Sequence, residues 1–156
     1  MSYSLVFTLH LIAAVIWVGG MFFAHMILRP SAIEILEPPQ RLALWLAVFG
    51  RFFFWVWIAI ITILLTGYWM IFDMFVGLTG FTVTYIQVMH IIGLVMVVIF
   101  SFIFFVPYQK FKAAVAAQQF PAGGEQINKI RQLVTTNLLL GLLTIIVASA
   151  GKYVNL

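Results

Sequence analysis

The stretch "TLHLIAAVIWVGGMFFAHMILRP", residues 8 to 30, decides the fold because it is long and apolar yet contains two histidines. A helix needs about 20 such residues to cross the hydrocarbon layer of a bilayer. Ionisable side chains inside such a helix are costly and usually have a function. The stretch therefore predicts a membrane-spanning helix, and it raises the question of what His10 and His25 do there.

The composition of the whole chain is that of an integral membrane protein. Of the 156 residues, 65% are hydrophobic and only 8% are charged, whereas soluble domains have about 25% charged residues. We expect an all-α, four-helix bundle in contact with lipid, forming a single domain over residues 1–156, and a homodimer stays open. The predicted spans are at about residues 4–28, 48–72, 81–108 and 131–152.

The basic residues predict how the bundle is oriented. Seven of the eight lie in or beside the first and third loops: Arg29, Arg41, Arg51, Lys110, Lys112, Lys129 and Arg131. Basic residues concentrate on the cytoplasmic side of membrane proteins. We therefore expect loops 1 and 3 to be cytoplasmic and both termini to be periplasmic, in a bacterial inner membrane. Orientation also accounts for the net charge of +4, so nothing supports nucleic-acid binding.

Prolines and glycines predict where the helices stop. The first loop holds three prolines, which we expect to interrupt helix from Pro30 until a new start near Gln40. The helix that follows is too long for a simple span, so it either tilts and protrudes or breaks near Gly50. In the third loop, the Pro-Ala-Gly-Gly sequence at 121–124 predicts a turn.

The inner half of the membrane contains a second set of polar residues. Arg51 either snorkels to the interface or needs a partner, and Asn137 of the fourth span is predicted at a depth where the two could pair. Asn137 begins a stripe of small and polar residues that continues through Gly141 and Thr144. Such a stripe predicts close contact with another helix.

His10 and His90 are predicted to lie at similar depth in the outer half of the membrane. They belong to the first and third spans, which run in the same direction, and their depths differ by ~8 Å or less. Small residues follow them at helical spacing: Ala14 follows His10, and Gly93 follows His90, while Gln87 precedes His90. This pattern predicts room for a flat group between the two helices.

A pair of neutral imidazoles points to a metal, and in a chain without cysteine it favours a haem iron with axial histidine ligands. We predict haem b bound by His10 and His90, with electron transfer near the periplasmic face. The redox partner would be a quinone or a small oxidant. Whether the protein is itself an oxidoreductase stays open. Trp17 lies on the same helix face as His10, and Lys152 is placed to meet a haem propionate.

Copper is the alternative metal. His25 lies near the inner boundary on the same helix face as His10, flanked by Met21 and Met26, and other methionines occur in the second and third spans. Imidazole and thioether groups are copper ligands. The chain could therefore pass copper ions across the membrane. A third interpretation is a structural subunit whose histidines only pair helices.

Two segments resemble a known family. The sequences "LHLIAAVIWVGGMFF" at residues 9–23 and "RQLVTTNLLLGLLTIIVASAGKY" at residues 131–153 are similar to the CopD-like (copper resistance protein D) membrane proteins. The four-span layout extends the similarity over nearly the whole chain, and the resemblance implies copper uptake or resistance. In architecture the chain also resembles the HemJ protoporphyrinogen oxidases, which bind haem. Those proteins carry a lysine in the third span, and this span has none before Lys110.

Overall fold

The computed structural model describes residues 2–74 and 83–151. Every regular element in these two ranges is a helix, which confirms the all-α prediction. The elements are α1 (Tyr3–Phe23), the π-helix η1 (Ala24–Leu28), α2 (Arg29–Ile35), α3 (Pro38–Met74), α4 (Thr84–Phe105), α5 (Pro107–Ala116) and α6 (Phe120–Ala150).

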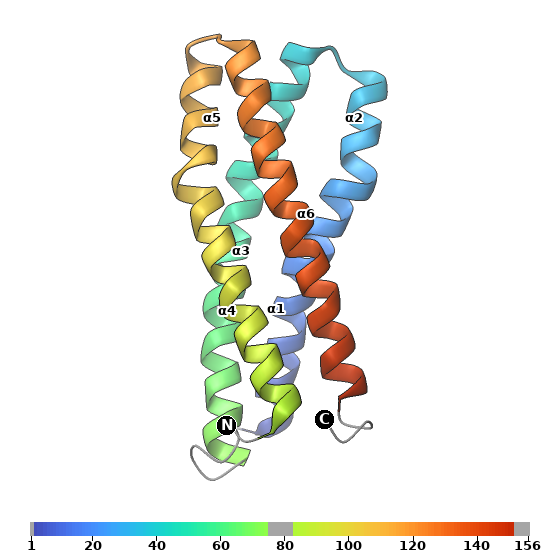
Figure 1. Cartoon of the computed structure of the whole chain (residues 1–156), viewed down its shortest axis with the longest axis vertical. Coiled ribbons are helices and arrows are strands. Elements are labelled where there is room, and N and C mark those ends of the chain that lie inside the picture. Colours follow the sequence, from blue (N-terminus) through green and yellow to red (C-terminus); the bar gives the residue numbers. More distant parts are fainter. Residues whose placement is uncertain (1, 75–82, 152–156) are drawn as a thin grey trace.

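These helices form four rods, each long and apolar enough to cross a membrane. The first rod joins α1, η1 and α2, the third joins α4 and α5, and the other two are α3 and α6. Figure 1 shows that the rods alternate in direction, so that α1 begins and α6 ends at the same end of the bundle. We call this the terminal end, and we call the opposite end, where α2, α3, α5 and α6 meet, the loop end.

The second rod settles one alternative that the sequence leaves open. Helix α3 is continuous over 37 residues and does not break at Gly50. A helix of this length exceeds the ~30 Å hydrocarbon thickness, so it protrudes or tilts. It starts at Pro38, slightly before Gln40, because a proline at the first helical position has no need of an N–H bond.

The prediction that Pro30 interrupts the first rod is wrong. Pro30 lies in the first turn of α2, directly after the π-helix η1. A proline in a helix removes one hydrogen bond and crowds the carbonyl four residues earlier, here that of Met26. The wider turn of a π-helix accommodates this crowding. The rod ends only at Leu36, whose backbone is extended with φ −112° and ψ 141°.

The prediction of a turn at 121–124 is also wrong. These residues form the first turn of α6, because Pro121 suits a helix start. The chain reverses just before them, between Ala116 and Phe120, where Gln118 has a φ of 55°. This left-handed residue allows α5 and α6 to run back along each other.

The rods pack as two pairs, α1 with α3 and α4 with α6. The pairs meet closely where Val18 of α1 lies against Gly141 of α6. A Cβ atom on Gly141 would be 2.8 Å from Cγ2 of Val18 and 3.2 Å from Cε of Met96. The predicted close contact of the small-residue stripe is therefore confirmed at Gly141.

Aromatic side chains fill the space between α3 and α4. Phe100 of α4 has its ring centroid 5.4 Å from that of Phe53 and 5.2 Å from that of Trp57, both on α3, and 6.3 Å from that of Trp17 on α1. Edge-to-face pairs of this kind contribute ~0.5–1.5 kcal/mol each beyond the area that they bury. The aromatic cluster continues toward the loop end and joins the two helix pairs there.

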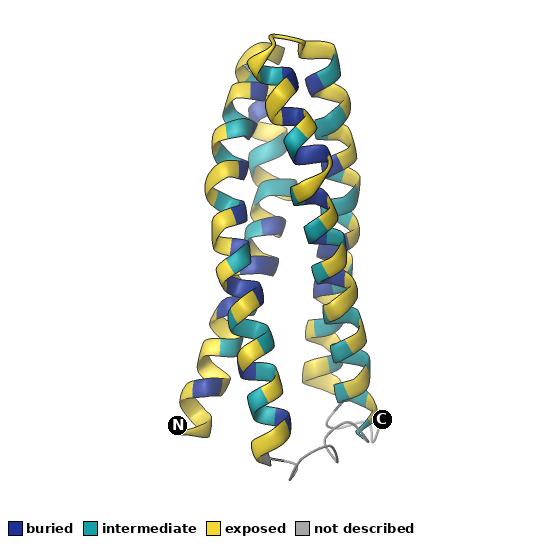
Figure 2. Cartoon of the chain, turned by 90° about the vertical axis from the view of Figure 1, so that its left-hand side faces the viewer, coloured by how far each residue is buried: buried dark blue, intermediate teal, exposed yellow. Residues whose placement is uncertain are grey.

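The terminal half of the bundle is packed less closely. No residue is buried at positions 84–95 of α4 or 142–150 of α6, whereas α1 and α3 still bury Val6, Thr66 and Ile71. Figure 2 shows how the buried residues thin out toward the end that carries the chain termini. His10 and His90 lie in this half and are half-buried.

The side of the membrane that each end faces stays a prediction, and the absence of cysteine from the chain makes it easy to test. Ser4 at the terminal end and Ala117 at the loop end are both exposed. We expect a membrane-impermeant maleimide to label Ser4→Cys in spheroplasts, and Ala117→Cys only after permeabilisation. The opposite labelling pattern would show that the bundle is inserted the other way.

The contact between α1 and α3 can be tested with two adjacent glycines. A Cβ atom on Gly20 would overlap the ring of Phe52, whereas a Cβ atom on Gly19 meets nothing within 4 Å. We expect Gly20→Ala to lose ~1–3 kcal/mol of stability through overpacking. Gly19→Ala is the matched control and should be at least as stable as the wild type, because alanine favours helix. Equal melting temperatures of the two variants in detergent would contradict this contact.

Candidate functional site

His10 of α1 packs against α3. Its Nδ1 atom is 2.8 Å from Oγ1 of Thr66. The ring also lies against Gly67, where a Cβ atom would be 3.3 Å from Cε1 of His10. The sequence predicts a site shared between the first and third spans, but this ring contacts Thr66 and Gly67 of the second.

The hydroxyl of Thr66 determines which nitrogen of His10 carries the proton. This hydroxyl donates its only proton to the backbone carbonyl of Thr62, one turn earlier in α3. In this arrangement it accepts from His10, in the tautomer that carries the proton on Nδ1. The lone pair of the neutral ring is then on Nε2. Thr66 thus orients His10 with Nε2 as the nitrogen that can bind a metal ion.

His90 of α4 contacts the same turn of α3 at a different residue. Its Nε2 atom is 3.5 Å from the hydroxyl of Tyr68, and the two rings meet edge-on with centroids 5.4 Å apart. Thr66 and Tyr68 are two positions apart, so they point in directions about 200° apart around the helix. The two histidines therefore approach one turn of α3 from different sides.

The small and polar residues predicted beside the histidines lie in the same loosely packed half. Ala14 is half-buried and Gln87 is exposed, each one turn from its histidine. A Cβ atom on Gly93 would meet nothing within 4 Å, so there is open space one turn from His90. Nothing in these positions identifies a bound group.

The other predicted site residues lie apart from this region or outside it. Trp17 is only 4% exposed and belongs to the aromatic core. His25 is at the loop end, where its Nδ1 is 3.4 Å from Oγ1 of Thr135; at 1.5 Å per residue it is ~22 Å along the rod from His10. Lys152 lies outside the described residues.

The described residues include no group of three or more His, Asp or Glu side chains that could hold a metal ion. Any metal in the terminal half would therefore depend on imidazoles together with other donors. Met70 of α3 and Met89 of α4 are half-buried in this half, and thioether sulfur is a soft ligand.

Asn137 of α6 is the most deeply buried polar residue, at 1% exposure. Its Nδ2 donates to the carbonyl oxygen of Met96, at 3.1 Å, and its Oδ1 has no hydrogen-bond partner among the described residues. The predicted pairing with Arg51 is wrong, because Arg51 is exposed; a long basic side chain near the membrane boundary reaches water more easily than the core. The free Oδ1 is an oxygen atom in the middle of the bundle that is available as a metal ligand.

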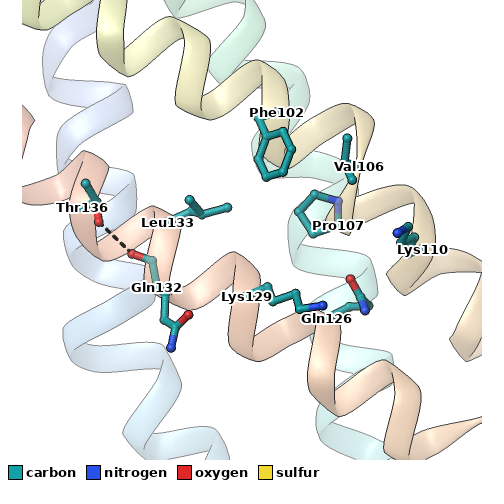
Figure 3. Close-up of a pocket in the computed structure, with 9 residues that line it drawn as sticks. All are labelled: Phe102, Val106, Pro107, Lys110, Gln126, Lys129, Gln132, Leu133 and Thr136. Atoms are coloured by element: carbon teal, nitrogen blue, oxygen red, sulfur yellow. Dashed lines mark hydrogen bonds between the residues drawn. The ribbon is translucent and has the colours of Figure 1, made fainter.

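Two cavities lie toward the loop end, and neither includes His10 or His90. The first has a volume of about 450 Å³ and is a groove between α4–α5 and α6 (Figure 3). Its basic residues are Lys110 and Lys129, and Lys129 pairs with Glu125 at 2.8 Å. The second has a volume of about 510 Å³ and lies among the loop ends of the first rod, α3 and α6.

The residues that position His10 and His90 were missed from the sequence. Thr66 and Tyr68 belong to "TGYWM", residues 66–70, a polar interruption of an otherwise apolar span. Hydroxyl groups in a span usually bond to the preceding turn of their own helix, so they did not point to a site. The informative signal was Gly67 between them, where a ring can approach the backbone.

Together these features define a multi-pass integral membrane protein with two histidines held by one turn of its second rod. A comparison with protein families matches residues 46–150 to CopD, copper resistance protein D. This match covers more than half of the chain, so the protein belongs to the copper resistance protein D family. The matched segment includes Thr66, Tyr68 and His90 but neither His10 nor His25.

Membership in this family confirms the resemblance seen in the sequence. No curated protein and no solved structure matches the chain. The likeness to HemJ proteins therefore receives no support. The family match and the four spanning rods both indicate a multi-pass protein whose apolar helices contact the lipid bilayer. They support the predicted location in the inner membrane.

The role of Thr66 can be tested without any metal. In the wild type we expect the nitrogen NMR signals of His10 to show a proton on Nδ1. Thr66→Val removes the acceptor, so the proton should move toward Nε2 and stability should fall by ~1 kcal/mol. Thr66→Ser keeps the hydroxyl and should keep the wild-type tautomer. An unchanged tautomer in Thr66→Val would show that the hydroxyl does not orient the ring.

Proposed function

We propose that this protein handles copper in the membrane and that His10 and His90, on different sides of α3, are two separate ligands for Cu(I) as its cargo. The observation that carries the proposal is the hydrogen bond between Thr66 and His10, which leaves Nε2 of a half-buried imidazole unprotonated. Membership in the copper resistance protein D family supports the choice of metal.

The donors of the terminal half suit Cu(I) better than a harder ion. Imidazoles and thioethers are neutral, soft or borderline ligands, and they favour copper over magnesium or calcium. A singly charged ion is also less costly to hold near lipid than a divalent one. Met70 of α3 and Met89 of α4 are half-buried thioethers in the same half of the bundle, available as further ligands beside either histidine.

The packing supports entry of the ion from the terminal end. Positions 84–95 and 142–150 are not buried, so α4 and α6 pack loosely on the terminal side of the bundle, where the histidines lie. Further in, the free Oδ1 of Asn137 and the buried thioether of Met96 are the next donors toward the core. In this proposal they relay the ion away from the histidines, which makes the protein a copper transporter.

Haem b fits the geometry less well. A haem held by both residues would need the two imidazoles to converge on one iron. Here His10 packs on Thr66 and Gly67, while Nε2 of His90 faces the hydroxyl of Tyr68. These contacts lie on different sides of α3. Electron transfer to a quinone or a small oxidant depends on the haem and has no separate support, and nothing described supports a homodimer.

Anaerobic titration of the purified protein with Cu(I), in competition with a chromogenic chelator, tests the proposal. We expect His10→Ala and His90→Ala each to weaken Cu(I) binding at least about tenfold, as loss of a ligand or its support does. His25→Ala is the matched control, since it removes a histidine at the other end of the same rod, and it should bind as the wild type does.

Two results would contradict copper binding at this site. One is equal Cu(I) affinity in the wild type and both terminal-half variants. The other is a Soret band in the protein as purified that disappears in His10→Ala and in His90→Ala, which would establish haem instead.

A further inference from the structure

We propose that the second cavity, at the loop end, binds a phosphate-bearing anion, and that anionic phospholipid of the surrounding leaflet supplies it. The cavity brings together three arginines from three different rods: Arg29 of α2, Arg41 of α3 and Arg131 of α6. We call it the arginine cavity. All three residues are half-buried.

The positive charge of the arginine cavity is not balanced by the protein. No acidic residue lines it, and none of the three arginines forms an ion pair within the described part of the chain. The nearest acidic residues in sequence, Glu34 and Glu37, are exposed. Like charges that line one partly buried site repel one another, so a bound anion would reduce the repulsion among the three arginines.

The helix ends add to this positive potential. Helix α3 begins at Pro38 and α6 begins at Phe120 and Pro121, and all three residues line the cavity. The N-terminus of a helix carries a partial positive charge, which favours an anion. Pro38, Pro39 and Pro121 have no N–H group, so the arginines are the main hydrogen-bond donors of this cavity. Guanidinium groups match phosphate oxygens in paired hydrogen bonds. The charges and the donors therefore select the same kind of ligand.

The rest of the wall is apolar, which favours a lipid over a soluble phosphate. Ile33, Leu42, Trp45, Phe49 and Val134 line the same cavity. An anionic phospholipid would place its phosphate against the arginines and its acyl chains against the apolar residues. Basic pockets between membrane helices on the cytoplasmic side bind anionic head groups in this way, and the loop end is the end predicted to be cytoplasmic.

The rule that places basic residues on the cytoplasmic side does not by itself explain this arrangement. It requires only that the side chains reach the interface, as the exposed Arg51, Lys110 and Lys112 do. Arg29, Arg41 and Arg131 instead turn toward one cavity of about 510 Å³.

Native mass spectrometry of the detergent-solubilised full-length protein tests the proposal. Dioleoyl-phosphatidylglycerol and dioleoyl-phosphatidylcholine are titrated separately, and inorganic phosphate is titrated in a third series. We expect the wild type to retain phosphatidylglycerol preferentially. Each of Arg29→Gln, Arg41→Gln and Arg131→Gln should weaken this binding about fivefold, and the triple variant should abolish the preference. The variant Arg51→Gln/Lys110→Gln/Lys112→Gln loses the same charge outside the cavity and should bind as the wild type does.

The outcomes separate the sources of the anion. Phosphatidylglycerol binding that is lost in the cavity variants alone supports the lipid. Binding of inorganic phosphate that depends on the arginines, with no preference between the two lipids, supports an anion site filled from solution and excludes the lipid. Equal lipid and phosphate binding in the wild type and the single cavity variants overturns the proposal. If the triple variant does not insert into the membrane, the three single variants test the proposal by themselves.

Discussion

The structure depends on one constraint: inside the hydrocarbon layer, each polar group must find its hydrogen-bond partner within the protein. The backbone meets this constraint by forming long helices. The hydroxyls of Thr62, Thr66, Thr135 and Thr144 meet it by donating to carbonyls one turn earlier in their own helices. Once the proton of Thr66 is used in this way, its oxygen can only accept from His10. The tautomer of His10 therefore follows from the way in which a threonine of the neighbouring helix satisfies its own hydroxyl.

The bundle uses its two halves differently. Toward the loop end, the aromatic cluster around Phe53 and Phe100 holds the two helix pairs together. Toward the terminal end, α4 and α6 bury no residues at positions 84–95 and 142–150. A closely packed half thus supports a more loosely packed one, and the loosely packed half contains the histidines that we propose as copper ligands. The arginine cavity is at the opposite end, so the two proposed sites can act independently.

The first rod connects both regions. It carries His10 at one end and His25 at the other, with the π-helix η1 next to the arginine cavity. The π-helix accommodates Pro30 without ending the rod. As a result Arg29, directly after the π-helix, is kept in a helix that faces α3 and α6. The first rod thus contributes residues from both η1 and α2 to the arginine cavity.

Sequence alone determined the class of protein, the four spans and the small-residue contact at Gly141, because hydrophobic length and helical spacing are local properties. It failed where a proline was absorbed by the helix, at Pro30 and Pro121. Tertiary structure alone decided which neighbour each histidine contacts and which arginines share a cavity. These depend on how each rod is rotated, and the rotation is set by the volumes of facing side chains, such as the small Gly67 beside His10 and the large Phe100 beside Trp57. Periodicity places a residue on a face of its own helix, but only packing determines what that face meets.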